Sequence, residues 1–291
     1  MRNVLETVGK VLDRDVSILI LGESGAGKDY LAEAIHVCSI RRAEPFVHIE
    51  CASIPPDLFE SELFGHERGT FTDAQARKPG RLELARRGTV YLDDVAALTP
   101  PLQAKLLRAI QEHRFTRLGG NASVPFEARV ISSSSADVTA SLADGTLRPD
   151  FYYRINVVTI ALPPLRERRE DIVALARHFA RRAGPARLTP EAERVLIAYS
   201  WPGNLRELRN AVERAAMLRS GDALPAEAFV PEDERALVAT GLRAGWTLEE
   251  LEAHYIREVL RTTGTNFSRA AEVLGINRKT LLEKRKKYGI E

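Results

Sequence analysis

The chain has 291 residues, of which 44% are apolar and 28% are charged, a composition typical of a globular protein that excludes a disordered one. At roughly 100–200 residues per domain, this length allows one large domain or two to three smaller ones. No apolar run reaches the roughly 18 residues of a membrane span, and the first residues lack the apolar core of a secretory signal. We therefore expect a soluble, cytoplasmic protein without a membrane partner.

Cysteine content and charge distribution narrow the class further. Cys38 and Cys51 are too few for a disulfide framework or a paired metal site, so we expect two buried thiols in a reducing compartment. The net charge of +2 does not by itself indicate nucleic acid. Residues 277–291, however, contain six basic residues against two acidic ones, and four of the eight lysines of the chain. A nucleic-acid contact is therefore expected at this end.

The first part of the chain predicts an α/β subdomain over residues 1–164. Apolar residues at helical spacing predict a helix over residues 3–14. Five short runs rich in β-branched residues predict strands buried on both faces. They cover residues 17–21, 46–49, 89–92, 128–131 and 157–160. A glycine-rich loop and a helical pattern follow the first strand, which is typical of the opening of a parallel sheet.

The rest of the chain is predicted to be helical. Three apolar faces at helical spacing fill residues 165–220. Residues 221–246 have weak periodicity with Gly, Pro and acidic residues, which indicates a linker. Helices over residues 248–262, 268–274 and 278–287 then predict a small all-α domain over 247–291.

The glycine-rich loop fits the phosphate-binding pattern G-x-x-x-x-G-K. Its glycines let backbone N–H groups face a phosphate, and the following helix adds positive potential at its N-terminus. Lys28 can reach the outer phosphates, although Asp29 replaces the usual Ser or Thr. The alternative is a glycine-rich turn with a surface lysine. The candidate nucleotide contacts are Gly22, Glu23, Ser24, Gly25, Ala26, Gly27, Lys28 and Asp29.

The strand at residues 89–92 ends in two carboxylates, Asp93 and Asp94. A magnesium nucleotide site needs one carboxylate to hold the ion, usually through water, and a second to polarise the attacking water. We assign Asp93 to magnesium and Asp94 to the water. The alternative is an ordinary solvated strand end, which the upstream phosphate loop disfavours.

Four motifs occur in the order of a known family. They are GESGAGKD at 22–29, ELFGHERGTFTDA at 62–74, LRPDFYYR at 147–154 and WPGNLREL at 201–208. The chain resembles the AAA+ domain of the bacterial enhancer-binding proteins, the sigma-54-dependent activators of the NtrC type. The resemblance implies an ATPase with a helical lid over 165–220, assembled as a ring, commonly a hexamer, with ATP and magnesium between neighbours.

The resemblance also assigns roles at the catalytic positions. Arg148 and Arg154 match the arginines that act on the neighbour's nucleotide, and the alternative for each is a solvated helix arginine. Arg206 matches the second sensor on the lid, with a salt bridge inside the lid as its alternative. Three positions depart from the pattern, which suggests a slow or differently regulated ATPase. Asp94 stands for Glu, Ser135 for the Asn of the first sensor, and Glu50 for the Asn that switches the catalytic carboxylate.

The loop that contacts sigma-54 in this family reads Gly-Ala-Phe-Thr-Gly-Ala. Here it consists of Gly69, Thr70, Phe71, Thr72, Asp73 and Ala74. Phe71 and Thr72 are kept. Asp73 adds a charge and removes glycine's freedom at a tight loop, and Thr70 adds a β-branched side chain. Weak contact with sigma-54 is therefore expected.

The C-terminal helices resemble the Fis-type helix-turn-helix of the same family. Gly275 permits the turn between two helices, and the second presents its N-terminal end as a recognition helix does. The alternative is a basic tail or a dimerisation hairpin. Leu248 and Tyr255 on the preceding helix fit a dimer interface or core packing equally well. The candidate DNA contacts are Asn277, Arg278, Lys279, Thr280, Lys284 and Lys286.

These features predict an ATP-hydrolysing, DNA-bound activator that remodels sigma-54 RNA polymerase holoenzyme from an upstream site, as a ring that is also dimeric through its C-terminal domain. One alternative is a DNA-binding regulator whose nucleotide gates oligomerisation without sigma-54. Another is a general AAA+ protein remodeller, against which the basic recognition helix argues.

Overall fold

The computed structural model describes residues 1–70, 76–135, 137–184, 186–219, 221–229, 245–263 and 266–290. The chain divides into two compact units, each described here by itself. One unit consists of Met1–Arg187 with Leu196–Asp222, and the other of Leu188–Val195 with Ala223–Glu291. Among the helices that the structure describes, none is both long enough and apolar enough to span a bilayer.

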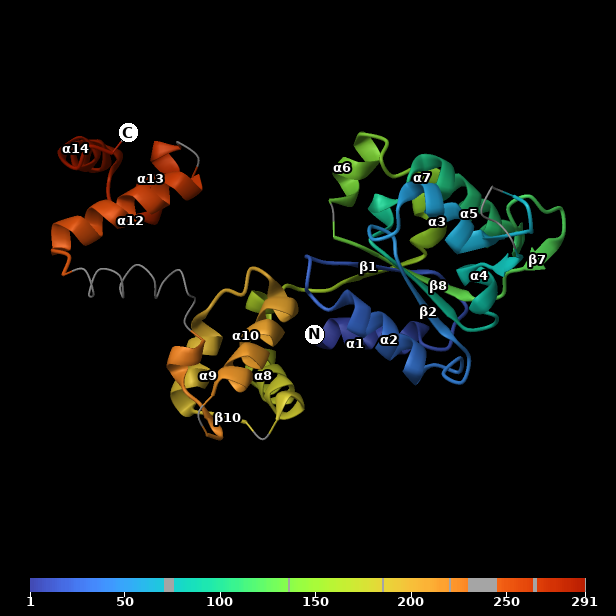
Figure 1. The fold of residues 1–291 in the computed structure, drawn as a ribbon, viewed down its shortest axis with the longest axis horizontal. Coiled ribbons are helices and arrows are strands. Elements are labelled where there is room, and N and C mark those ends of the chain that lie inside the picture. The colour runs from blue at the N-terminus through green and yellow to red at the C-terminus, as the bar shows by residue number, and fades with distance from the viewer. Residues whose placement is uncertain are drawn as a thin grey trace. The chain divides into compact units, whose positions relative to one another are not determined.

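A five-stranded parallel sheet forms the centre of the first unit (Figure 1). Its strands lie in the order β2-β5-β8-β1-β9. They are β1 (Ile18–Leu21), β2 (Phe46–Glu50), β5 (Thr89–Asp93), β8 (Arg129–Ser134) and β9 (Val158–Ala161). All five predicted strands are confirmed. Because all pairings are parallel, the carboxyl ends of the strands meet at one edge, where Glu50 lies opposite Asp93.

Helices cover both faces of this sheet (Figure 1). Ile18 and Ile20 face one core, shared with α1 (Arg2–Val11) and α2 (Lys28–Cys38). Leu19 faces the other core, shared with four further helices, because successive strand residues point to opposite faces. These helices are α3 (Pro56–Phe64), α4 (Arg81–Leu84), α5 (Pro100–Glu112) and α7 (Pro149–Ile155). The doubly covered parallel sheet is the predicted fold class. Cys51 is buried as expected, whereas Cys38, the last residue of α2, is exposed, so the expectation of two buried thiols is wrong for Cys38.

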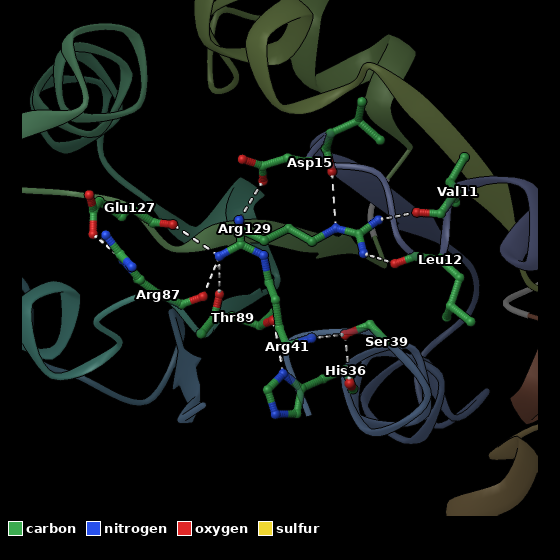
Figure 2. A network of polar contacts seen from close by, with 12 residues as sticks. Val11, Leu12, Asp15, His36, Ser39, Arg41, Arg87, Thr89, Glu127 and Arg129 are labelled. Carbon is green, nitrogen blue, oxygen red and sulfur yellow. Dashed lines mark hydrogen bonds and ion pairs between the residues drawn. The ribbon is translucent and has the colours of Figure 1, made fainter. Parts of the chain in front are cut away.

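Helix α1 ends at Val11 rather than at residue 14 as the periodicity predicts. The buried guanidinium of Arg129 donates to the backbone oxygens of Val11 at 2.8 Å, Leu12 at 2.7 Å and Val16 at 3.2 Å (Figure 2). A cation that binds the last carbonyls of a helix stabilises its end. These hydrogen bonds from β8 therefore stabilise the end of α1 at Val11.

Several short elements are not evident from the sequence pattern. The antiparallel pairs β3 (Gly65–His66) with β4 (Lys78–Pro79) and β6 (Arg114–Thr116) with β7 (Ser123–Pro125) have too few residues for a clear period. Helix α6 (Val138–Ala143) and the 3-10 turns η1 (Val95–Ala97) and η2 (Leu165–Glu167) are equally short.

The helical part after the sheet contains α8 (Arg169–Ala183), α9 (Pro190–Ala198) and α10 (Asn204–Leu218), as predicted. The predicted linker begins with ordered elements: β11 (Ala223–Leu224) pairs with β10 (Arg187–Leu188), and η3 (Ala226–Ala228) follows. The remainder of that linker prediction falls largely on residues 230–244, which lie outside the described residues.

The three C-terminal helices are confirmed with small shifts of their ends. They are α12 (Leu248–Thr263), α13 (Phe267–Val273) and α14 (Arg278–Lys287). Gly275 makes the turn between α13 and α14 at φ +65°, in the left-handed region that glycine tolerates. The three helices share one core of Ile256, Val259, Ala270, Ala271, Leu281 and Ile290.

Candidate nucleotide site and nucleic-acid interface

A polar cavity of about 380 Å³ lies at the carboxyl edge of the sheet. It brings together residues of the phosphate loop, the ends of β2, β5 and β8, and the start of α10. They are Ser24, Gly25, Gly27, Lys28, Asp29, His48, Glu50, Ala52, Ser53, Asp93, Asp94, Ser135 and Arg206. The predicted loop, carboxylates and both sensor positions therefore meet in one cavity. This edge is where ligands bind in open parallel sheets.

The glycines of the phosphate loop are required by close packing as well as by conformation. Gly25 and Gly27 have φ values of +73° and +95°. A Cβ on Gly25 would lie 2.4 Å from the backbone oxygen of Gly203, and one on Gly27 would lie 2.7 Å from Leu205 Cδ1. The loop thus turns its backbone into the cavity beneath the lid helix α10.

Lys28 starts α2 inside this loop and is only 7% exposed. Its Nζ donates to the backbone oxygens of Gly22 at 2.9 Å and Glu23 at 3.1 Å. Burial lowers the pKa of Lys28, and the carboxylates of Asp93 and Asp94 oppose that shift. The loop therefore encloses one ammonium group at the floor of the cavity, facing two carboxylates.

The two carboxylates after β5 are held differently. Asp93 Oδ1 accepts from the hydroxyls of Tyr91 and Ser133. Asp94 has φ +59°, which is uncommon for a residue with a side chain and marks a constrained position. Its backbone N–H donates to Ser133 Oγ at 3.0 Å, and its Oδ2 accepts from Ser135 Oγ at 3.0 Å. Asp94 Oδ1 is buried and has no partner among the described residues.

The lid helix α10 contacts the phosphate loop through backbone and side-chain hydrogen bonds. The carbonyl of Gly25 accepts from the N–H groups of Leu205 at 2.9 Å and Arg206 at 3.3 Å. Arg206 Nη1 donates to Ser24 Oγ at 3.0 Å. The guanidinium of Arg206 therefore lies over the loop and lines the cavity, instead of forming the salt bridge within the lid that was its alternative.

Two lid residues that the sequence did not single out hold Glu23 of the loop. Arg166 donates two hydrogen bonds to its carboxylate, at 2.8 and 2.6 Å, and Asn204 Nδ2 donates one at 3.0 Å. These hydrogen bonds, Arg166 first, lower the pKa of Glu23 to about 2. The pairing stabilises the fold above the ordinary carboxyl pKa and is lost as the pH falls toward 2. Asn204 is fully buried with φ +54°.

The two predicted trans arginines do not line the cavity of their own chain. The side chain of Arg148 is 40% exposed and pairs with Asp150 on the same helical turn at 2.7 Å. Arg154 Nη2 donates to the carbonyl of Ile110 at 2.9 Å, while its Nε is buried without a partner among the described residues. Arg154 instead lines a second cavity of about 810 Å³, together with Arg41 and Arg129 of the network in Figure 2.

The base of the candidate sigma-54 loop is anchored, whereas Phe71, Thr72, Asp73 and Ala74 lie outside the described residues. Thr70 Oγ1 donates to the backbone oxygens of Glu67 at 2.6 Å and Leu118 at 3.1 Å. Gly69 before it has φ +81°. The hydroxyl of Thr70 therefore anchors the base of the loop, a role that the sequence did not predict.

A buried arginine forms ion pairs near the same loop base. Arg117 is 7% exposed and contacts two carboxylates, Glu67 at 2.9 Å and Glu83 at 2.8 Å. A buried guanidinium satisfied by two carboxylates is costly to break from either side. Its contacts fix the approach of the chain to the loop.

In the C-terminal unit, the candidate DNA contacts fall into two groups. Asn277 caps α14 by accepting from the N–H of Thr280 at 2.8 Å, and Arg278, Lys279 and Lys286 are exposed. Lys284, by contrast, forms an ion pair with Glu252 of α12 at 2.7 Å. Lys287 pairs with Glu249 of α12 in the same way, so these two lysines bind α14 to its neighbour rather than standing free.

Three family profiles match consecutive parts of the chain. They are the Sigma-54 interaction domain over residues 1–161, the AAA+ ATPase lid domain over 166–240, and the bacterial regulatory protein, Fis family, over 247–288. The transcriptional regulatory protein ZraR of Salmonella typhimurium strain LT2 is 42% identical over 98% of this chain, and the regulatory protein AtoC of Escherichia coli K12 is 39% identical over 100% of it. In each case the chain spans 66% of the relative's length.

Solved structures agree with these matches. The crystal structure of NtrX from Brucella abortus superposes with a TM-score of 0.73 at 38% identity, over 100% of this chain and 68% of that one. NtrX structures in complex with ADP and with ATP have TM-scores of 0.72 and 0.71.

Proposed function

We propose, from the premise that the chain belongs to the Sigma-54 interaction domain family, that it is an ATP-hydrolysing, DNA-binding transcriptional activator acting on sigma-54 RNA polymerase. The observation that carries the ATPase part is the single cavity that joins Lys28, Asp93 and Arg206. A buried ammonium, paired carboxylates and a lid guanidinium are the groups that phosphoryl transfer needs.

ATP with magnesium fits the residues of this cavity. Lys28, the loop N–H groups and Arg206 supply positive potential for phosphates, and NtrX has been crystallised with ATP. Asp93, at the end of β5, would hold magnesium through water, with the unpartnered Oδ1 of Asp94 beside it. Magnesium would neutralise charge on the outer phosphates. The loop and Asp93 would hold the nucleotide, and Ser135 fixes the direction of the Asp94 carboxylate.

The domain assignment follows the same reading. We assign residues 1–164 to the α/β ATPase subdomain, 165–220 to the lid, 221–246 to a linker and 247–291 to the DNA-binding domain. Arg148 and Arg154 lie away from the cavity of their own chain, which supports a homo-oligomeric ring, with six subunits the commonest number for such domains, in which each acts on a neighbour's nucleotide. A cytoplasmic location fits a regulator of this class.

The lysines of α14 that contact DNA can be told apart from those that pair with α12 by comparing two alanine variants. Lys286→Ala should weaken binding of specific and non-specific DNA alike and lower the salt slope by about one, because an exposed lysine there can neutralise a phosphate. Lys284→Ala is the matched control on the same helix. It should leave the salt slope unchanged and lower the melting temperature of the domain, since Lys284 pairs with Glu252. Equal salt slopes for both variants in fluorescence anisotropy would contradict this assignment.

Base-edge contact is assigned to the N-terminal end of α14. Arg278 is exposed one residue after the Asn277 cap, where a recognition helix meets the major groove. Lys279 and Thr280 follow it on the first turn.

The sigma-54 contact is tested at Asp73. Asp73→Gly should raise sigma-54 binding in the presence of a transition-state nucleotide mimic and leave ATP turnover unchanged, because it removes a charge from the candidate sigma-54 segment. Thr70→Ala should reduce that gain, since the Thr70 hydroxyl fastens the loop base, whereas Thr70→Ser keeps the hydroxyl. Strong binding by the unmodified loop would show that Asp73 is compatible with sigma-54.

The whole function is tested by ATP-dependent open-complex formation with purified sigma-54 holoenzyme at a promoter carrying an upstream site. Open complexes that require both ATP and the upstream site are the expected result. ATP hydrolysis and DNA binding without open complexes would instead favour a regulator whose nucleotide gates oligomerisation.

A further inference from the structure

Besides Asp29 of the phosphate loop, the nucleotide cavity is lined by three carboxylates at the ends of β2 and β5, namely Glu50, Asp93 and Asp94. Glu50 ends β2, and its Cα lies directly opposite that of Asp93 in the parallel register. Adjacent strands are about 4.8 Å apart. The N–H of Cys51 donates to the backbone oxygen of Asp93 at 3.0 Å, which fixes the end of β2 against that of β5. Glu50 is exposed and lines the same cavity as Lys28.

The three carboxylates at the strand ends differ in the groups that already bind them. Asp93 accepts two hydroxyl hydrogen bonds, and His48 Nε2 lies 3.9 Å from its Oδ2. Asp94 is fixed on a left-handed backbone by Ser133 and Ser135. In the part of the chain that the structure describes, no hydrogen bond or ion pair reaches the Glu50 carboxylate. Glu50 therefore keeps all its lone pairs and a side chain one methylene longer than aspartate.

A general base needs free lone pairs and freedom to meet the water that it deprotonates. Asp94 offers one oxygen, buried and held in direction by the bond from Ser135 to the other. We propose that Glu50, rather than Asp94, is the carboxylate that deprotonates the attacking water, and that Asp94 is a positioning residue. This rests on the proposed ATPase function.

The step balances in atoms and charge. The water oxygen forms a bond to the terminal phosphorus, and the bond from that phosphorus to the bridging oxygen of ADP breaks. The water proton passes to the Glu50 carboxylate and then to the departing phosphate or solvent. Lys28 and Arg206 supply positive charge on the phosphate side of this transfer.

Glu50→Gln, Asp94→Asn and Glu33→Gln are compared in the full chain. Glu33 is an exposed glutamate of α2 outside the cavity and serves as the matched control. Glu50→Gln should reduce turnover by on the order of 10²-fold or more, the scale of a general base. It should also bind a fluorescent ATP analogue as tightly as the unmodified protein or more tightly, because a negative charge near the phosphates is gone. Asp94→Asn should lose less turnover, and Glu33→Gln none.

The readouts separate the possible failures. If Glu50→Gln binds the ATP analogue and turns over as fast as the unmodified protein, the inference is wrong. A larger loss in Asp94→Asn than in Glu50→Gln would return the base to Asp94. If Glu50→Gln loses binding and turnover together, it acts in nucleotide binding and the inference also fails. Absence of hydrolysis by the unmodified chain, despite ATP binding that Lys28→Ala removes, would overturn the proposed ATPase itself. A second readout is the nucleotide that remains bound after incubation with labelled ATP. Isolated Glu50→Gln protein should contain labelled ATP, whereas isolated unmodified protein should contain labelled ADP.

Discussion

Lys28→Ala should abolish both ATP binding and ATP hydrolysis. Lys28 is the one lysine among the residues that line the nucleotide cavity, and its ammonium is enclosed by the carbonyls of Gly22 and Glu23. Alanine would leave the loop N–H groups and Arg206 to neutralise the phosphates. Next to Asp93 and Asp94, that positive charge is insufficient, since the two carboxylates repel the same phosphates.

Equilibrium titration with a fluorescent ATP analogue measures this loss directly. Lys10→Ala, at the exposed end of α1, is the control for removing one positive charge. Circular dichroism and thermal melting of both variants separate a lost site from a lost fold, because Lys28 also satisfies two loop carbonyls. Folded Lys28→Ala protein with unchanged nucleotide affinity would place the nucleotide elsewhere.

The parallel sheet, and the position of the nucleotide cavity at its carboxyl edge, could be predicted from local sequence. The apolar runs at residues 17–21 and 89–92 are bounded by glycine or carboxylates, and parallel strands place such ends side by side. The family, which the four motifs indicate, is confirmed by the three profiles. Local pattern sufficed here because the loop chemistry and the strand signal lie within a few residues of each other.

The lid contacts of Glu23 could not be predicted in the same way. Arg166 of η2 and Asn204 of α10 are far along the chain from Glu23, and only the packing of these two elements near the loop brings them to this carboxylate. The early end of α1 has a similar origin, since Arg129 acts on it from the start of β8. Tertiary contacts decide both features, and helical periodicity contains no trace of them.

The basic run of α14 shows the limit of charge counting. The sequence places Lys284 and Lys286 among the candidate DNA contacts and leaves out Lys287, yet Lys284 and Lys287 both pair with acidic residues of α12. The two acidic partners lie in a segment that the sequence reads only as an amphipathic helix. Which lysines face DNA therefore depends on the packing of α12 against α14.

Arg148→Ala and Arg154→Ala should each leave ATP binding intact and lower turnover by about 10³-fold or more, the scale for an arginine that acts on a neighbour's transferred phosphoryl group. The two variants should differ in stability. The guanidinium of Arg148 is partly exposed and, among the described residues, pairs with Asp150 alone, so its loss should leave the melting temperature unchanged. Arg154 donates to the end of α5 and is partly buried, so alanine there should lower the melting temperature as well.

Mixing experiments decide whether these arginines act between subunits. Lys28→Ala protein lacks a working loop but keeps both arginines, whereas Arg148→Ala keeps the loop. In the proposed ring, a mixture of the two variants then contains some interfaces with an intact loop on one side and an intact arginine on the other. Turnover in the mixture should exceed the sum of the turnovers of the separate variants, and the same should hold for Arg154→Ala.

The control is Arg114→Ala, which removes an exposed arginine that pairs with Glu112 and should need no rescue. A mixture with no gain for either arginine would mean that each site is completed within its own chain. Within one chain, Arg154 donates to Ile110 and lines the second cavity rather than the cavity that contains Lys28, which is why we propose that it acts on the neighbouring subunit.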